Sequence, residues 1–391
     1  MTNTRKKILY IVEADLTSGS GKCALELIKS VKNNTEFEPV VITQFYNELN
    51  TKCNELSIEN YSSHFARTCS RGMGLFGWAI AFLCRPFLNF LSYKKLKRKI
   101  DFTSLHLIHS NTSAIDFGAY LYRKLHIPHI WHIREFLIFN HMLHPIVYNL
   151  PKYIVNNSSC IITVSNQLNI FLQNRTKCSN IKTIYDGVYS NSKKIAPQST
   201  NDSGKLRLVC VGNLTPLKGQ DTLLEAVGLL SKQILDQISI DFYGQCTEDF
   251  EKKLKKMVRK ISIESVVSFK GYCNDIFGLL ADYDIGVQPS HTEGFSRVTV
   301  EYMLSGLCVV GNGDTAIQEL VEDGITGLLY KDYDIQALAD KISYCFYNRD
   351  RMKELGQNAR KIALEKYCIE KNFYNIVNEY NSIIKTNILS E

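Results

Sequence analysis

The sequence predicts an α/β protein built from two doubly wound, Rossmann-like domains in tandem. Its 391 residues, 45% of them hydrophobic and 22% charged, are enough for two globular domains. Short apolar segments alternate with helical patterns of ten or more residues, which is typical of parallel sheets covered by helices. This alternation stops at the polar stretch 189–204 and then starts again. We therefore place a first domain at 1–190 and a second domain at 200–371.

The first half contains a series of expected strands separated by helices. Its helical patterns are clearest over 21–32 and 112–125. Each expected strand is a short apolar segment with turn residues at its ends. The strand ranges are 7–14, 39–45, 105–111, 126–135, 159–166 and 181–188.

The second half repeats the pattern. The expected strands are 206–213, 238–244, 266–272, 284–290 and 308–312. The expected helices are 219–234, 248–261, 275–282 and 298–306, and the last 40 or so residues are also helical. Ligands of such sheets sit beyond the carboxyl ends of the strands, so the loops after the strands are where we expect the site.

The glycine-rich segment LTSGSGKCALELI (16–28) invites comparison with a phosphate-binding P-loop. A P-loop requires G-x-x-x-x-G-K-[ST], because backbone N–H groups wrap the phosphates and a hydroxyl holds magnesium. Counting back from Gly21-Lys22 puts Leu16 where the first glycine belongs, and Cys23 occupies the hydroxyl position. The segment is therefore not a P-loop, and its glycines need another explanation.

Composition and charge exclude several classes of protein. Twelve cysteines without C-x-x-C or C-x-x-H spacing predict reduced thiols, not a zinc site or a disulfide framework. Residues 1–200 carry 24 Lys and Arg against 12 Asp and Glu, whereas residues 201–391 carry 22 against 27. The basic first half lacks RNA-recognition and helix-turn-helix signatures, so we expect no nucleic-acid partner. The apolar run at the N-terminus is too short for a signal peptide, which predicts a cytoplasmic protein.

A membrane surface is the anionic partner that we expect for the first half. The apolar run Met73–Cys84 is too short to span a bilayer, and Arg85-Pro86 interrupts it. The basic cluster SYKKLKRKI (92–100) follows. Large apolar residues, one tryptophan and this cluster predict that 72–100 lies in the interface of an anionic membrane. The alternative is a core helix followed by a solvated basic helix.

The densest group of candidate site residues follows the expected strand 284–290. A glycine-containing turn leads from this strand into a helix that starts near Arg297, so Glu293 lies in the loop and Glu301 lies one turn into the helix. The N–H groups of the first helical turn offer an anion site, and carboxylates accept well from vicinal hydroxyls. Diphosphate on the N–H groups, ribose on one carboxylate and hexose on the other together predict a nucleotide sugar. A helix-capping pair is the alternative.

Two kinds of apparent metal motif are not expected to bind metal. The first DYD triplet, Asp282–Asp284, directly precedes a buried strand, and Asp334 of the second triplet sits where a helix N-cap belongs. The histidines of the first half do not occur in H-E-x-x-H context. We therefore expect neither a metal ion nor a cofactor.

Seven segments between about residue 105 and residue 335 resemble retaining glycosyltransferases of the GT-B fold, in the large family-four group (glycosyl transferases group 1). They are WHIREF, TVSN, YDGV, VGNLTPLKGQDTLLEAV, FKGY, ADYDIGVQPSHTEGFSRVTVEYMLSG and GNGDTAIQELVEDGITGLLY. The resemblance implies two Rossmann-like domains that face a central cleft, with the nucleotide-sugar donor in the second domain and the acceptor in the basic first one. It also implies that a final helix, about 372–391, crosses back to the first domain.

The resemblance implies roles for individual residues. Glu301 would hold the ribose hydroxyls, Glu293 would contact the donor sugar near its anomeric centre, and Lys218 would pair with the diphosphate. The backbone of Gly271-Tyr272 would meet the base, and the loop Gly311–Asp314 would close over the sugar. Further candidates for donor binding on these loops are Gly294, Phe295, Ser296 and Gly313.

The sequence departs from the family pattern at two positions. Asn213 stands where the family usually has an arginine that clamps the diphosphate, and we expect Arg297 to supply the missing positive charge. The family often has a histidine six residues after the proline of the strand 126–135. That position here is Arg134, our first choice for the reaction centre, and His132 is the second.

The resemblance also suggests what the glycine-rich turn does. In such enzymes the turn lies near the donor phosphate and the incoming acceptor, so Gly19, Ser20 and Gly21 would let the backbone approach closely. The alternative is a tight strand-to-helix turn without a ligand.

The expected activity is transfer of a hexosyl unit, with retention and without a metal, from a nucleotide diphosphate sugar to a glycan acceptor. The basic, apolar first domain favours a lipid-linked precursor of a bacterial surface polysaccharide, such as O-antigen or capsule. The protein would then be peripheral on the inner face of the plasma membrane. A small soluble acceptor, a nucleotide-sugar binder without catalysis and a GT-B-type epimerase remain as alternatives. The base, the hexose and the linkage are not encoded in any motif that we can read.

Overall fold

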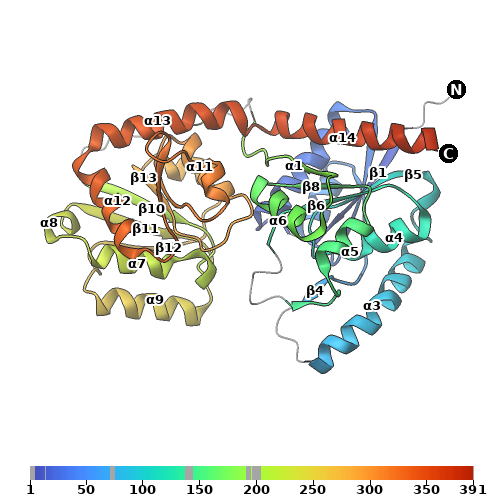
Figure 1. Ribbon diagram of the computed structural model, residues 1–391, viewed down its shortest axis with the longest axis horizontal. Helices are drawn as coiled ribbons and strands as arrows, with labels where there is room; N and C mark the ends of the chain where they lie inside the picture. The colour runs from blue at the N-terminus through green and yellow to red at the C-terminus, as the bar shows by residue number, and fades with distance from the viewer. Residues whose placement is uncertain are drawn as a thin grey trace. The chain divides into compact units, whose positions relative to one another are not determined.

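Two α/β units make up the chain in the computed structural model. It describes residues 5–13, 15–70, 75–136, 144–190, 195 and 204–390. Unit 1 comprises Met1–Gly187 together with Ile369–Glu391, and unit 2 comprises Val188–Cys368. Each unit is built on a parallel sheet with helices (Figure 1), which confirms the predicted class of doubly wound α/β domains.

The sheet of unit 1 has seven parallel strands in the order β3-β2-β1-β5-β6-β8-β9. The register places Lys6 of β1 opposite Phe37 of β2 and keeps one residue opposite one along the whole pair. A short antiparallel pair, β4 (Cys69–Ser70) and β7 (His144–Pro145), lies outside this sheet. The strands of the main sheet are β1 (Lys6–Val12), β2 (Phe37–Thr43), β3 (Glu59–Ser62), β5 (Leu105–Ser110), β6 (His129–Ile133), β8 (Cys160–Thr163) and β9 (Ile181–Thr183).

Each face of this sheet carries its own hydrophobic core, because successive side chains of a strand point to opposite faces. Ile8 and Tyr10 of β1 pack in the cluster that contains α1 (Gly19–Asn34) and the C-terminal helix α14 (Ile369–Ser390). Leu9 and Ile11 pack in the other cluster. The second cluster contains residues of α3 (Leu75–Leu96), the 3₁₀ turn η1 (Phe102–Ser104) and α4 (Phe117–Leu125). The remaining helices of unit 1 are α2 (Glu48–Glu55), α5 (Leu150–Asn156) and α6 (Asn166–Thr176).

Two helices differ from the sequence-based expectation. The helix expected over 112–125 begins only at Phe117, because the carboxylate of Glu135 accepts hydrogen bonds from the Ser113 N–H and hydroxyl and holds the preceding residues in a turn. Helix α3 continues through Pro86, where we expected an interruption. Proline removes one backbone hydrogen bond. The helix tolerates this loss because Arg85 and Asn89, on either side of Pro86, both bind Asp116.

The sheet of unit 2 has six parallel strands in the order β12-β11-β10-β13-β14-β15. These are β10 (Leu206–Val211), β11 (Ile238–Tyr243), β12 (Val267–Gly271), β13 (Ile285–Gln288), β14 (Cys308–Asn312) and β15 (Gly327–Tyr330). The helices and 3₁₀ turns are η2 (Pro216–Lys218), α7 (Gln220–Gly228), α8 (Lys232–Leu235), α9 (Glu248–Lys260), α10 (Ile276–Leu280), α11 (Arg297–Leu304), η3 (Ala316–Glu319), α12 (Ile335–Tyr347) and α13 (Arg349–Lys366).

The strand order shows where a ligand site is expected in each unit. In a doubly wound sheet, ligands bind beyond the carboxyl ends of the two strands at which the strand order reverses. That point lies between β1 and β5 in unit 1 and between β10 and β13 in unit 2. The loops that follow these four strands are therefore the candidate site regions.

Candidate active site

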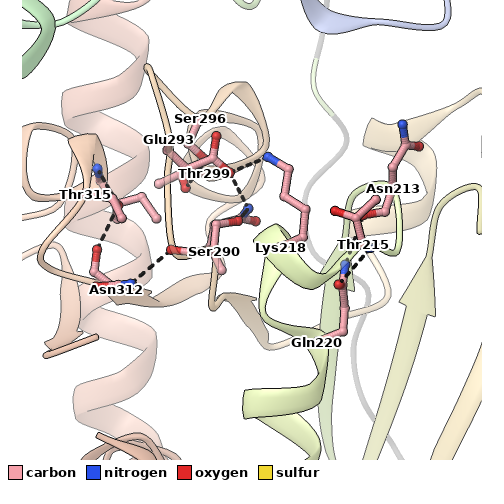
Figure 2. A network of polar contacts seen from close by, with 12 residues as sticks. Asn213, Thr215, Lys218, Gln220, Ser290, Glu293, Ser296, Thr299, Asn312 and Thr315 are labelled. Atoms are coloured by element: carbon pink, nitrogen blue, oxygen red, sulfur yellow. Dashed lines mark hydrogen bonds and ion pairs between the residues drawn. The ribbon is translucent and has the colours of Figure 1, made fainter. Parts of the chain in front are cut away.

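The candidate donor site lies beyond β10 and β13 in unit 2. Lys218, at the end of η2, and Glu293, in the loop after β13, form an ion pair with 2.6 Å between Nζ and Oε1 (Figure 2). The amide of Gln288, the last residue of β13, donates to the same carboxylate oxygen at 3.0 Å. The structure thus brings together two residues that the sequence analysis assigned to the diphosphate and to the donor sugar. Both are on unit 2 and 75 residues apart in the chain.

A second layer of polar contacts holds the loop after β13. The Gln288 amide also donates to the Ser290 hydroxyl at 2.8 Å, and the Asn312 amide donates to the Ser290 carbonyl at 3.0 Å. Asn312 ends β14, and its carbonyl accepts from the Thr315 hydroxyl. These contacts are buried, so they fix the loop that carries Glu293 relative to β13 and β14.

Helix α11 begins beside this loop. Ser296 precedes it in the left-handed region, with φ 71° and ψ 76°, and its side chain does not cap the helix. Its hydroxyl instead bonds the Thr299 hydroxyl at 2.8 Å. The first turn of a helix has N–H groups without intrahelical acceptors and a positive dipole end. The geometry therefore suits an anion at the turn Gly294–Ser296, where the sequence analysis placed the diphosphate.

Arg297 and Glu301 occupy the first two turns of α11. Their side chains are mostly buried, and 3.9 Å separates Nη2 of Arg297 from Oε1 of Glu301. This long contact places the guanidinium at the start of the helix, the position from which we expect it to offset Asn213. Both residues lie on the helix that the sequence analysis predicted, and their roles toward a donor stay predictions.

The loop after β10 is shaped by backbone contacts. The Tyr302 hydroxyl, from α11, accepts from the Val211 N–H at 2.7 Å, and the Gln220 amide donates to the Asn213 carbonyl at 3.2 Å. Figure 2 shows the Asn213 side chain pointing away from Gln220. The exposed Asn213 amide is thus not used to hold the loop.

Gly219, directly after Lys218, has a structural reason to be glycine. Its φ is +66°, and a Cβ there would lie 2.1 Å from the Pro289 carbonyl oxygen. A side chain at this position would push η2 away from the loop after β13. The glycine therefore lets Lys218 come within reach of Glu293.

A cavity of about 360 Å³ lies beyond β10, β11 and β12. Its lining includes Gly244, Gln245, Gly271 and Tyr272. Gly271 has φ +74° with open space where a Cβ would stand, and the Tyr272 ring is exposed. This is where the sequence analysis expected the base. Gly313, the remaining candidate of unit 2, follows β14 and donates its N–H to the Tyr330 carbonyl.

Arg134 is a buried residue of unit 1 at the carboxyl end of β6. Its Nη1 donates to both carboxylate oxygens of Asp186 at 2.6 and 2.7 Å, and its Nε donates to the Asn111 amide oxygen. Although burial lowers the pKa of a guanidinium, the Asp186 charge holds the pKa of Arg134 above its usual value. A permanently charged group is therefore fixed in place beyond β5 and β6.

His132 is fully buried on the same strand. Its Nδ1 lies 3.3 Å from Nε2 of His109, and Nδ1 of His109 lies 2.7 Å from the Tyr380 hydroxyl on α14. Burial lowers the pKa of His132 well below its usual value and that of His109 to about 3. Both rings are neutral, and Nε2 of His132 has no hydrogen-bond partner within the described residues. The roles of Arg134 and His132 at a reaction centre stay predictions.

The glycine-rich turn of unit 1 has an explanation within the chain. Gly19 and Ser20 are the first residues of α1, and the Ser18 side chain caps the helix by accepting from the Gly21 N–H. A Cβ on Gly21 would lie 1.8 Å from the Asp15 carbonyl oxygen. The tight turn alone therefore requires glycine at residue 21, and approach of a ligand to Gly19–Gly21 stays a prediction.

Some residues of these networks received no individual role in the sequence analysis. They are Gln288, Ser290 and Asn312 around Glu293, and Asp186 opposite Arg134. A signal existed for Gln288, since it is a polar residue at the end of the otherwise apolar strand IGVQ. Asp186 lies in the matched segment YDGV, but its contact with Arg134 could not be read from that segment, because Arg134 lies 52 residues earlier in the chain.

Comparison with known proteins identifies the family of the chain. Residues 191–362 match the family described as glycosyl transferases group 1. An uncharacterized glycosyltransferase of Methanocaldococcus jannaschii is 30% identical over 292 residues, which cover 72% of this chain and 76% of that protein. A poly(ribitol-phosphate) alpha-N-acetylglucosaminyltransferase of Staphylococcus aureus is 27% identical over 237 residues, which cover 59% of this chain and 46% of that protein.

Solved structures show the same fold. The Anabaena protein HepE, in complex with UDP and glucose, aligns with a TM-score of 0.78 at 22% identity, covering 96% of this chain and 100% of that one. The chain therefore has the GT-B fold and belongs to the group 1 glycosyltransferases.

Proposed function

We propose that this glycosyltransferase moves a hexosyl unit from a nucleotide diphosphate sugar to a lipid-linked glycan acceptor, with retention of the anomeric configuration. The observation that carries the donor half of the proposal is the Lys218–Glu293 pair beside the N-terminus of α11. A cation, a helix N-terminus and a carboxylate at the switch point of the sheet suit the diphosphate and the hydroxyls of such a donor.

The donor-binding residues have distinct roles in this proposal. Lys218, Arg297 and the first N–H groups of α11 stabilise the diphosphate as it leaves, which is where negative charge develops. Glu301 accepts from the ribose hydroxyls, and Glu293 accepts from the hexose. These cations take the place of a metal ion, so we propose a metal-independent reaction.

In the proposed reaction, the bond between the anomeric carbon and the diphosphate oxygen breaks first. The diphosphate keeps the electron pair, and the acceptor hydroxyl attacks from the same face within the resulting ion pair. Its proton passes to the departing diphosphate, which is the nearest base. The new glycosidic bond therefore has the configuration of the donor.

The acceptor half of the proposal rests on the basic residues in the first half of the chain and on a relative. Residues 1–200 carry an excess of twelve positive charges, from 24 Lys and Arg against 12 Asp and Glu. The S. aureus relative is named as a poly(ribitol-phosphate) alpha-N-acetylglucosaminyltransferase, and a poly(ribitol-phosphate) is anionic. We propose a lipid-linked precursor of a bacterial surface polysaccharide, reached from the inner face of the plasma membrane.

A binding and hydrolysis panel tests the donor half. UDP-, GDP-, ADP- and dTDP-sugars are compared by thermal shift and by slow hydrolysis, using the wild type, Glu301→Gln and the control Glu225→Gln. Glu225 is an exposed glutamate on α7 of the same unit. One nucleotide should stabilise the wild type and the control, be hydrolysed by both, and lose both effects in Glu301→Gln. A ligand at 100 times its Kd stabilises by about 2.7 kcal/mol; if every sugar nucleotide leaves the melting temperature unchanged, the proposal is wrong.

A further inference from the structure

Helix α3 binds the rest of unit 1 through polar side chains. Arg85 donates to Oδ1 of Asp116 at 2.9 Å, and the Asn89 amide donates to Oδ2 of the same carboxylate at 2.6 Å. Asn89 also accepts from the Ala66 N–H, and the Ser92 hydroxyl donates to the His64 carbonyl. The Asp116 and Asn89 side chains are almost completely buried. The inward face of the middle of α3 is thus hydrogen-bonded and charged.

The outward face of α3 is apolar. Its exposed large side chains follow each other at helical spacing, so they form one row along the helix: Phe76, Ile80, Leu83, Phe87 and Leu91. Leu83 is 74% exposed and Phe87 is 60% exposed. Phe90 flanks this row and is also exposed. In Figure 1, α3 lies at the periphery of unit 1, with one side free of other elements of that unit.

Helix α3 has its polar side chains against the protein and its apolar row outward, which is the reverse of an ordinary surface helix. A surface helix places its apolar stripe on the core and its charges outward, and contiguous exposed apolar surface marks a binding site. The Asp116 contacts oppose rotation of the apolar row of α3 inward, because rotation would remove Arg85 and Asn89 from a buried carboxylate. Among the described residues, the carboxylate would then keep the Tyr153 hydroxyl alone. The outward orientation is therefore built into unit 1.

The positive charge at one end of the apolar row favours an anionic partner. No aspartate or glutamate occurs between Glu59 and Asp101. Lys94 continues the row at the next helical position after Leu91, and the exposed basic residues that surround it are Lys95, Lys97, Arg98 and Lys99. Within the described ranges, which omit 71–74, no helix is long and apolar enough to cross a bilayer. An apolar ridge with a basic end suits the interface of an anionic membrane.

We propose that α3 docks on an anionic lipid bilayer, parallel to its surface, with the row from Phe76 to Leu91 among the acyl chains and Lys94 and Lys95 at the headgroups. This goes beyond the sequence-level expectation for 72–100, because it names the face that enters the lipid and the carboxylate that orients it. The proposal takes from the proposed function only the lipid-bound acceptor. It is tested without any sugar donor, so the two succeed or fail separately.

Co-sedimentation of the full chain with vesicles is the first test. Vesicles of phosphatidylcholine and phosphatidylglycerol in equal amounts are compared with vesicles of phosphatidylcholine alone. Replacing Leu83 and Phe87 by Gln is expected to weaken binding to both kinds of vesicle. The loss should be about tenfold for each apolar side chain removed from the acyl region. Replacing Lys94 and Lys95 by Gln is expected to cost about fivefold for each charge, only on the anionic vesicles.

The matched control is Ile170→Gln. Ile170 lies on α6 of the same unit and is 56% exposed, so it also removes an exposed apolar side chain. Its binding should equal that of the wild type. Because every substituted position is exposed, thermal melts of the variants should match the wild type, which separates lost docking from lost folding.

Tryptophan fluorescence gives a second, independent readout. The chain has two tryptophans: Trp78 lies on α3 and Trp131 is completely buried in the sheet. Trp78 lies on the same side of α3 as Arg85 and donates to the Pro145 carbonyl, so the probe is a tryptophan placed on the apolar row instead. Lipids with brominated acyl chains should quench part of the emission of the Leu83→Trp/Trp78→Phe variant and none of that of Trp78→Phe.

Three results would overturn the proposal. One is equal vesicle binding by the wild type and by the Leu83→Gln/Phe87→Gln variant. Another is emission of the Leu83→Trp/Trp78→Phe variant that brominated lipids leave unchanged. The third is a wild type that ignores vesicles but sediments as a dimer that the variant cannot form, because the apolar row would then be covered by a second copy of the chain.

Discussion

Replacing Glu293 by Gln is expected to change nucleotide binding and sugar transfer in opposite directions. In the structure the Glu293 carboxylate neutralises Lys218, with 2.6 Å between Oε1 and Nζ. Glutamine keeps the volume and can still accept from the Gln288 amide, but it carries no charge. Lys218 then interacts with an incoming diphosphate without competition. A free nucleoside diphosphate should bind more tightly, whereas the hexose loses a charged acceptor.

The size of the effect follows from the exposure of the pair. Exposed ion pairs contribute about 0.2–1 kcal/mol, and buried hydrogen bonds to charged groups contribute about 1.5–3 kcal/mol. Lys218 is 33% exposed and Glu293 is 10% exposed, so this pair falls between the two classes. We take about 1 kcal/mol, which lowers the Kd of the nucleoside diphosphate about fivefold. Transfer should fall by about 100-fold or more, because the lost charge faces the reacting sugar.

Titration calorimetry with the nucleoside diphosphate that the donor panel identifies measures this effect. Lys218→Met should weaken binding about tenfold, since it removes a charge-assisted contact to phosphate. Lys253→Met is the matched control. Lys253 also forms an ion pair in unit 2, with Asp221 at 3.1 Å, and its loss should leave binding unchanged. If Glu293→Gln weakens the binding of the nucleoside diphosphate as much as Lys218→Met does, the carboxylate does not compete for the lysine and the reasoning fails.

Three further predictions concern stability. Tyr302→Phe removes the acceptor of the Val211 N–H and should lower the free energy of unfolding by about 1–3 kcal/mol. The melting temperature should fall by about 2–4 °C for each kcal/mol. An unchanged melting temperature would contradict the contact. Gly219→Ala should lower the free energy of unfolding by clearly more than the roughly 1 kcal/mol expected for Gly324→Ala. Both glycines have positive φ, but of the two only Gly219 would bring its new Cβ against a backbone oxygen, that of Pro289. Equal losses of unfolding free energy in urea would show that Pro289 moves aside easily. Burial lowers the pKa of His129 to about 4. As the pH falls, His129 is therefore protonated in the unfolded chain before it is protonated in the folded protein. The free energy of unfolding should then fall as the pH drops below about 6.5, by on the order of 2 kcal/mol at pH 5 from this residue, and a flat profile in urea titrations would disprove a neutral buried ring.

The strands were predictable because their signal is local. Segments such as residues 7–14 and 206–213 are apolar, short and bounded by turn residues, and β1 and β10 form there. The helix start at Phe117 was not predictable in the same way. Glu135 holds the residues before it, and 22 residues separate Glu135 from Ser113. A contact across two elements of the fold leaves no periodic trace in either segment.

The same distinction applies to the candidate site. Glu293, Glu301 and Lys218 lie in segments with family motifs, and the first and third meet in the structure. Gln288 and Asn312 lie in matched segments too, but the resemblance assigns neither of them the role of holding the Glu293 loop. Their function depends on the adjacency of β13 and β14, which is a property of the sheet order.

Helix α3 shows why hydropathy alone could not choose between a core helix and an interfacial one. Both alternatives require a long apolar segment, and they differ only in which face the protein covers. That choice depends on Asp116, which lies outside α3 and accepts from Arg85 and Asn89. The two polar residues are four positions apart on one side of the helix, so a single carboxylate on the body of unit 1 fixes its rotation. The apolar row faces outward as a consequence, and a sequence pattern for such a helix would need both the segment and its distant acceptor.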